Sequence, residues 1–150
     1  MKNNKGFGFG LVSGVITTLG MMVGLFSATN SKTVVISGII TIAIADALSD
    51  AFGIHVSEEA VEKSHKKVWK TTFYTFISKL FFALTFLIPI TIFTLQTAII
   101  LSIAYGIILI AIYSWLNSKK SIYAAFEHIS LSIIVIILTY IIGKIIEILI

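Results

Sequence analysis

The chain has 150 residues, of which 57% are hydrophobic and only 12% are charged. This composition lies outside the range of globular domains and is typical of a membrane protein. The absence of cysteine excludes disulfides, thiolate metal ligands and thiol nucleophiles. All the basic residues are lysines. No soluble domain is expected to carry them on a basic face, so nucleic acid is not an expected partner.

Two apolar segments of membrane-spanning length open the chain. Residues 6–29 would extend about 36 Å as a helix, enough to cross a hydrocarbon core of about 30 Å. The second segment, 33–53, carries Asp46 and Asp50 in its last turns. The mixed charged and apolar segment 57–78 follows, and we expect it to be a cytoplasmic helical linker lying outside or along the membrane surface.

The remaining spans follow from one long uncharged stretch and the apolar C-terminal segment. No formal charge occurs from Leu80 to Leu116, and this length predicts two helices joined near Thr94, Gln96 and Thr97. Pro89 is expected to bend the first of the two rather than end it. The predicted spans are therefore 6–29, 33–53, 79–96, 98–116 and 128–149.

The lysines predict the orientation of these spans. With five spans, most lysines outside the membrane fall on one side, and short loops rich in lysine are cytoplasmic. We therefore expect an all-α integral membrane protein, a single domain over residues 1–150, with a cytoplasmic N-terminus and its C-terminus on the opposite side. Abundant isoleucine and lysine suggest an AT-rich prokaryotic genome, so the expected location is the plasma membrane of a prokaryote.

Asp46 and Asp50 are the first candidate site. Residues four apart share one helical face, so the two carboxylates could converge on one cation. Ionisable groups within a span are costly and usually face a cavity, which favours a functional role. The alternative places Asp50 at the membrane interface and pairs Asp46 with a lysine such as Lys79, which we otherwise interpret as an interfacial anchor at the start of the third span.

A second acidic group follows at the end of the second span. Glu58, Glu62 and His65 follow helical spacing, with Glu59 adjacent. Oxygen and imidazole ligands suit ferrous, manganous or zinc ions. The alternative is a solvated helix face on which the acids pair with lysines.

The first span also carries two glycine pairs, Gly10 with Gly14 and Gly20 with Gly24. Pairs four residues apart allow close approach of helices in lipid, and we expect them to form a dimer packing face. The alternative is that glycine is simply frequent in membrane helices.

The sequence contains no nucleophile–histidine pattern, phosphate-binding loop or HExxH motif. We therefore expect neither an enzyme nor a permanently bound cofactor.

Three motifs resemble elements of the vacuolar iron transporter family. "SGVITTLGMMVGL" at 13–25 resembles the family's first span, and "IADALSDAFGIHVS" at 44–57 resembles its second. "LTYIIGKII" at 138–146 is similar to its closing element, and Pro89 fits the proline of its third span. The motifs occur in the family's order along a chain of five spans.

The resemblance implies a homodimer that exports ferrous or manganous ions from the cytoplasm in exchange for protons. It implies a pathway between the first two spans of both protomers, lined here by Ser13, Thr17, Met21 and Ser49. Three features depart from the family pattern. Ser13 replaces a usual aspartate, Asp50 replaces a usual methionine, and the linker is too short for the three-helix cytoplasmic metal-binding domain of many members.

The sequence therefore predicts a divalent metal exporter, with the metal ion as substrate. Asp46 and Asp50 would form the membrane site, while Glu58, Glu59, Glu62 and His65 would collect ions at the cytoplasmic mouth. One alternative is a non-transporting sensor or assembly protein of the same fold. Another is an organic-cation or small-solute carrier, which would require an aromatic-lined pocket.

Overall fold

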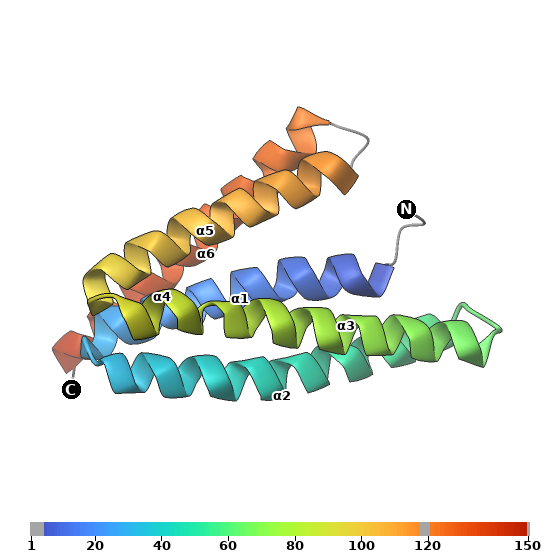
Figure 1. The fold of residues 1–150 in the computed structure, drawn as a ribbon, viewed down its shortest axis with the longest axis horizontal. Coiled ribbons are helices and arrows are strands. Elements are labelled where there is room, and N and C mark those ends of the chain that lie inside the picture. The colour runs from blue at the N-terminus through green and yellow to red at the C-terminus, as the bar shows by residue number, and fades with distance from the viewer. Residues whose placement is uncertain (1–4, 118–120, 150) are drawn as a thin grey trace.

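A computed structural model describes residues 5–117 and 121–149. The regular structure in these ranges is entirely helical, which confirms the expected all-α fold (Figure 1). The helices are α1 (Lys5–Thr29), α2 (Lys32–Glu59), α3 (His65–Thr85), α4 (Leu87–Ile92), α5 (Leu95–Asn117) and α6 (Ile122–Leu149). With α3 and α4 counted as one, the described ranges hold five helices long and apolar enough to cross a membrane. The chain is therefore an integral membrane protein.

Both residues of the turn between α1 and α2, Asn30 and Ser31, favour the reversal of the chain. Asn30 ends α1 with a positive φ of 46°, a conformation that asparagine tolerates better than most residues. Its N–H donates to the Phe26 carbonyl at 2.9 Å. Ser31 then caps α2, since its hydroxyl accepts the Val34 N–H at 3.4 Å. These two residues reverse the chain without a longer loop.

Helix α3 starts at His65, before the expected start of the third span at residue 79, and α2 continues to Glu59. Most of the segment expected as a linker is thus part of the helical bundle. The buried side chains of α3 already include Val68, Thr72 and Thr75, which share the helix face with Lys79. Lys79 itself is only 1% exposed. The interpretation of Lys79 as an interfacial anchor is therefore wrong.

Pro89 lies just after a break in the third span. Proline has no N–H for the carbonyl four residues earlier, which here belongs to Thr85, the last residue of α3. At the break, the Phe86 N–H bonds the Ala83 carbonyl three residues earlier at 3.3 Å. Helix α4 then continues the span to Ile92. The turn that follows lies at Phe93 and Thr94, close to the predicted position.

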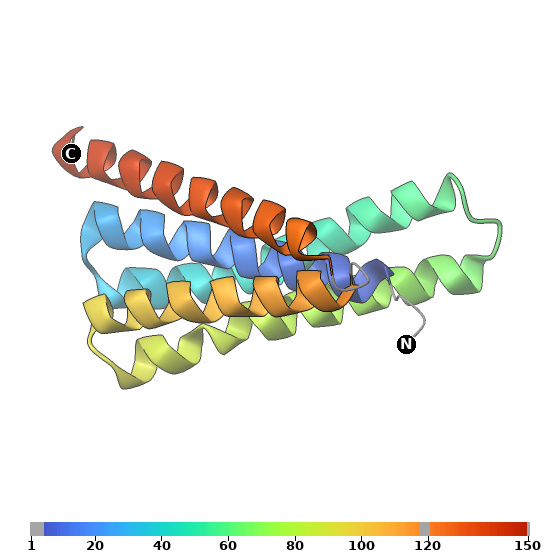
Figure 2. The same ribbon diagram turned by 90° about the horizontal axis from the view of Figure 1, so that it is seen from above.

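Helix α1 occupies the middle of the bundle (Figure 2). It contacts α2, α3, α5 and α6, and its buried residues form much of the apolar core, including Val15, Leu19 and Met22. Helix α6 is far more exposed, with only Ala125, Ser132 and Gly143 buried among its described residues. Large exposed apolar side chains are expected where a protein faces lipid rather than water.

The glycine pairs of α1 pack inside the chain. A Cβ atom at Gly14 would lie 3.0 Å from the Lys79 carbonyl oxygen of α3, and one at Gly10 would lie 2.5 Å from the Thr75 carbonyl oxygen. Gly20 and Gly24 face Thr139 of α6, where a Cβ atom would lie 3.3 Å from Thr139 Cγ2 at Gly20 but at the ordinary contact distance of 3.5 Å from the Thr139 carbonyl oxygen at Gly24. Close helix approach is therefore their role within one protomer, and a dimer would need another face.

The two ends of the bundle differ in what they carry. The N-terminal end of α1 and the turn between α2 and α3 lie at one end, where the α2–α3 hairpin projects furthest (Figures 1 and 2). The turns after α1 and α4, with the C-terminal end of α6, lie at the other. The projecting end of the hairpin, residues 58–70, carries three glutamates and four lysines.

Candidate functional site

A cluster of one ammonium and two carboxylates lies between α1, α2 and α3. The Lys79 Nζ atom is 2.6 Å from Asp46 Oδ2 and also forms an ion pair with Asp50 Oδ2. The Ser13 hydroxyl accepts a hydrogen bond from Lys79 Nζ at 2.9 Å and donates one to Asp50 Oδ2 at 2.7 Å. Three helices thus supply one polar cluster inside the membrane-spanning bundle.

The two carboxylates differ in how they are held. Asp50 receives hydrogen bonds from both Ser13 and Lys79. The contact between Lys79 and Asp46 is an ion pair by distance, but Asp46 Oδ2 receives no hydrogen bond from the described residues. Asp46 is therefore the less firmly held member of the pair, and its side chain is 27% exposed.

Helix α1 makes room for this cluster. Gly10 and Gly14 allow the backbone of α3 to approach closely, so the stem of Lys79 lies directly against α1. Ser13 lies next to Gly14 in the sequence and contributes the hydroxyl that bridges Lys79 and Asp50. The segment GLVSG of α1 thus forms the surface against which the buried lysine packs.

An open pocket of about 520 Å³ adjoins Asp46 between α1 and α2. Three of the four residues expected along the pathway, Thr17, Met21 and Ser49, line it, while Ser13 lies in the cluster. The Thr17 Oγ1 atom is buried and has no hydrogen-bond partner among the described residues. The pocket is mostly apolar, and its polar lining residues are Thr17, Thr41, Asp46 and Ser49.

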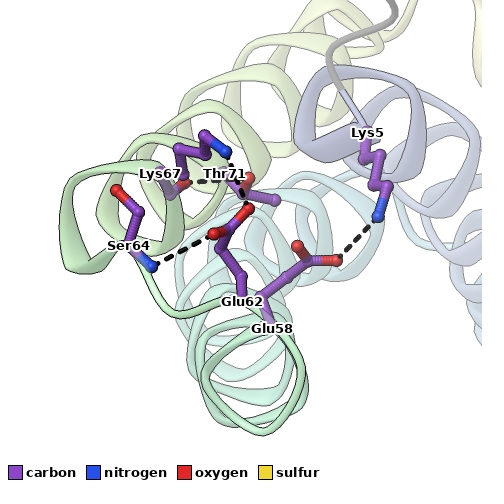
Figure 3. A network of polar contacts seen from close by, with 6 residues as sticks. All are labelled: Lys5, Glu58, Glu62, Ser64, Lys67 and Thr71. Carbon is purple, nitrogen blue, oxygen red and sulfur yellow. Dashed lines mark hydrogen bonds and ion pairs between the residues drawn. The ribbon is translucent and has the colours of Figure 1, made fainter.

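Two of the acids expected at the mouth, Glu58 and Glu62, each lie near a lysine rather than converging on one point (Figure 3). Glu58 pairs with Lys5 at 3.5 Å, and Glu62 pairs with Lys67 at 3.1 Å. Glu59 and His65 are exposed. This arrangement is the one expected of a solvated, salt-bridged face.

Glu62 also accepts a hydrogen bond from the backbone N–H of Ser64 at 3.1 Å. That bond, with the hydrogen bond from Lys67, lowers the pKa of Glu62 below its usual value of 4.5. The carboxylate therefore closes the turn between α2 and α3.

The histidines contact neighbouring helices instead of the acidic residues. His55 Nδ1 lies 2.9 Å from Thr72 Oγ1, and its ring contacts that of Trp69 at a tilt of 58°, with 4.5 Å between centroids. His128 Nδ1 lies 2.7 Å from Ser114 Oγ, which links α5 to α6. Within residues 5–117 and 121–149, no three histidine, aspartate or glutamate side chains are grouped to hold a metal ion.

The sequence offered the pairing of Asp46 with Lys79 only as an alternative, and contacts of Lys79 with Asp50 and Ser13 were not expected. The structure shows that Lys79 contacts all three residues. One signal was present, because Lys79 is the only charged residue between Lys70 and Lys119. An isolated charge in such a stretch indicates an intramembrane partner as readily as an interface.

Comparisons with protein-family models, with curated proteins and with solved structures find no match to this chain.

Proposed function

We propose that this protein is a membrane transporter of cations that exports ferrous or manganous ions from the cytoplasm in exchange for protons. The observation that carries this proposal is the oxygen-rich cluster of Asp46, Asp50 and Ser13, which lies within spanning helices and adjoins an open pocket. The motifs of the first two spans, which resemble those of iron transporters, support the choice of substrate.

The net charge of the cluster supports a cation as the transported species. Two carboxylates and one ammonium leave one negative charge among helices that span the membrane. Ionisable groups at this depth are costly and are generally retained for transport or proton transfer. A purely structural ion pair would not need the second carboxylate.

The available ligand atoms suit a divalent metal of the proposed kind. Carboxylate and hydroxyl oxygens favour manganous and similar ions over cuprous ions. Asp46 and Asp50 provide carboxylates, and Ser13, Ser49 and Thr17 provide hydroxyls near them. In this proposal Glu58, Glu59, Glu62 and His65 raise the local concentration of metal ions at the end of the pathway.

A homodimer would complete the pathway, and α2 offers the face for it. Small residues four apart point outward along this helix: Ser37, Thr41, Ala45, Ser49 and Gly53. Such a stripe allows helices to pack closely in lipid. Thr41, Ala45 and Ser49 also line the pocket beside Asp46, so a second copy on this face would shield the charged cluster from lipid. This face replaces the glycines of α1 in the proposal.

The non-transporting alternative also has an observation in its favour. Lys79 already pairs with both carboxylates, so the cluster could serve only to hold α2 and α3 together. A sensor or assembly protein would need no more than this.

Flux measurements in proteoliposomes distinguish the two functions. Liposomes loaded with a metal-quenched dye should show uptake of Mn²⁺ or Fe²⁺ by the unmodified protein, with opposite movement of protons reported by a pH-sensitive dye. Asp46→Asn should reduce the metal flux at least tenfold, whereas Glu147→Gln, at the far end of α6, should leave it unchanged. The absence of metal flux in the unmodified protein would favour the non-transporting alternative.

A further inference from the structure

We propose that Lys79 is a resident cation that competes with the transported metal. In this mechanism a metal ion binds between Asp46 and Asp50 only after the Lys79 ammonium leaves that position. The inference rests on the proposed function and assigns to Lys79 the control of metal affinity at the same site.

The position of the ammonium is the first argument. The Lys79 ammonium donates hydrogen bonds to Asp50 and to the Ser13 hydroxyl, and it forms an ion pair with Asp46. With a residue exposure of 1%, Lys79 is enclosed by these groups and by α1. A metal ion bound by both carboxylates would occupy the space that the ammonium now fills.

Charge balance is the second argument. With Lys79 in place, a divalent ion would convert a cluster with one negative charge into one with a positive charge, and the two cations would repel each other at close range. With Lys79 displaced, two carboxylates neutralise one divalent ion completely. Binding of the metal and departure of the ammonium are therefore coupled by electrostatics.

An acceptor for the displaced ammonium lies one turn away on α3. Thr75 is fully buried, and its Oγ1 atom has no hydrogen-bond partner within the described residues. Side chains in a helix lean toward its N-terminus, so Lys79 leans toward Thr75. Gly6 of α1 faces this hydroxyl, because a Cβ atom there would lie 2.9 Å from Thr75 Oγ1.

Binding of Mn²⁺ to purified variants tests the competition. Lys79→Gln removes the cation and keeps a polar side chain, so it should bind Mn²⁺ at least tenfold more tightly than the unmodified protein. Lys79→Arg keeps the charge and should bind no more tightly than the unmodified protein. Lys144→Gln removes an exposed lysine on α6 and should not change the affinity.

A second measurement uses the unmodified protein, because Lys79→Gln leaves two carboxylates without a cation and could fail to fold. Acetylation of amines, read by peptide mass spectrometry, should spare Lys79 in the metal-free protein. Saturating Mn²⁺ should increase acetylation of Lys79 several-fold, because an ammonium bonded to the Thr75 hydroxyl alone is held less firmly than one enclosed by two carboxylates and Ser13. Acetylation of Lys144 should stay constant.

The outcomes separate this inference from the proposed function. Two results would refute competition between Lys79 and the metal but leave the proposed metal transport intact. One is equal Mn²⁺ affinity of the unmodified protein and Lys79→Gln, and the other is a Lys79 that stays protected from acetylation when Mn²⁺ is bound. If neither protein binds Mn²⁺, the proposed function fails and the inference fails with it.

Discussion

Gly14 lies against Lys79 so closely that a Cβ atom at Gly14 would be 3.1 Å from the Lys79 Cγ atom and 3.2 Å from its Cα atom. The buried lysine of α3 can therefore lie against α1 only because Gly14 has no side chain. The same helix contact continues at Gly10, where a Cβ would clash with Ser78 Oγ and lie 2.5 Å from the Thr75 carbonyl oxygen. The cluster depends on this close contact between two helices.

Alanine substitutions at the glycines should reveal this dependence. Gly10→Ala places a methyl group against backbone atoms that cannot move aside, so it should destabilise the protein by about 1–3 kcal/mol, the usual cost of overpacking. Gly24→Ala is the matched control, because its Cβ would lie 3.5 Å from the nearest atom, an ordinary contact. Melting curves in mild detergent measure both, and an equal loss of stability would contradict the packing argument.

The two aspartates should be strongly coupled in stability. Asp46→Asn or Asp50→Asn alone leaves Lys79 one carboxylate, so each change should be mild. The double variant leaves the buried ammonium without a counter-charge and should lose about 3–5 kcal/mol, well beyond the sum of the single losses. Adding Lys79→Met to the double variant should restore much of the stability. Additive losses in unfolding titrations would show that the three groups do not form one cluster.

The turn between α2 and α3 should lose stability in acid. The folded pKa of Glu62 is lowered by the Ser64 N–H and by Lys67, so its stabilising effect is complete above the ordinary value of 4.5 and is lost as the pH falls through the lowered pKa. The Ser64 amide signal in an NMR titration should therefore change with a midpoint below 4.5. Lys67→Met should raise that midpoint, whereas Lys70→Met, which removes a lysine without a bond to Glu62, should not.

The outward face of α2 should decide the oligomeric state. Ala45→Phe places a large ring in the middle of the small-residue stripe and should convert a dimer to a monomer in mild detergent. Ala104→Phe makes the same change at an exposed position of α5 and should leave the mass unchanged. A dimer that persists with Ala45→Phe would show that the interface lies on another face. An unmodified protein that is monomeric would show that no dimer forms in this detergent.

The sequence alone determined the class of the protein and the number of its spans. Long uncharged segments must form helices in lipid, because the backbone has no water to bond with, so length and hydropathy suffice to count them. Local chemistry also marked the break near Pro89 and the turn near Thr94. The pairing of Asp46 with a lysine was considered from the sequence, but only as an alternative to a metal site.

The tertiary structure alone decided which side chains meet. Lys79 is 29 residues from Asp50 and 66 residues from Ser13, and no helical periodicity relates positions on different helices. The same reason explains the glycines of α1, whose spacing indicates a close contact without indicating whether α3, α6 or a second copy makes it. The packing of the first turns of α3 follows the same rule: these turns are charged in sequence, and the buried positions among them are recognised only from the helices that cover them. Spans follow from the chemistry of one segment, whereas a site follows from the packing of several.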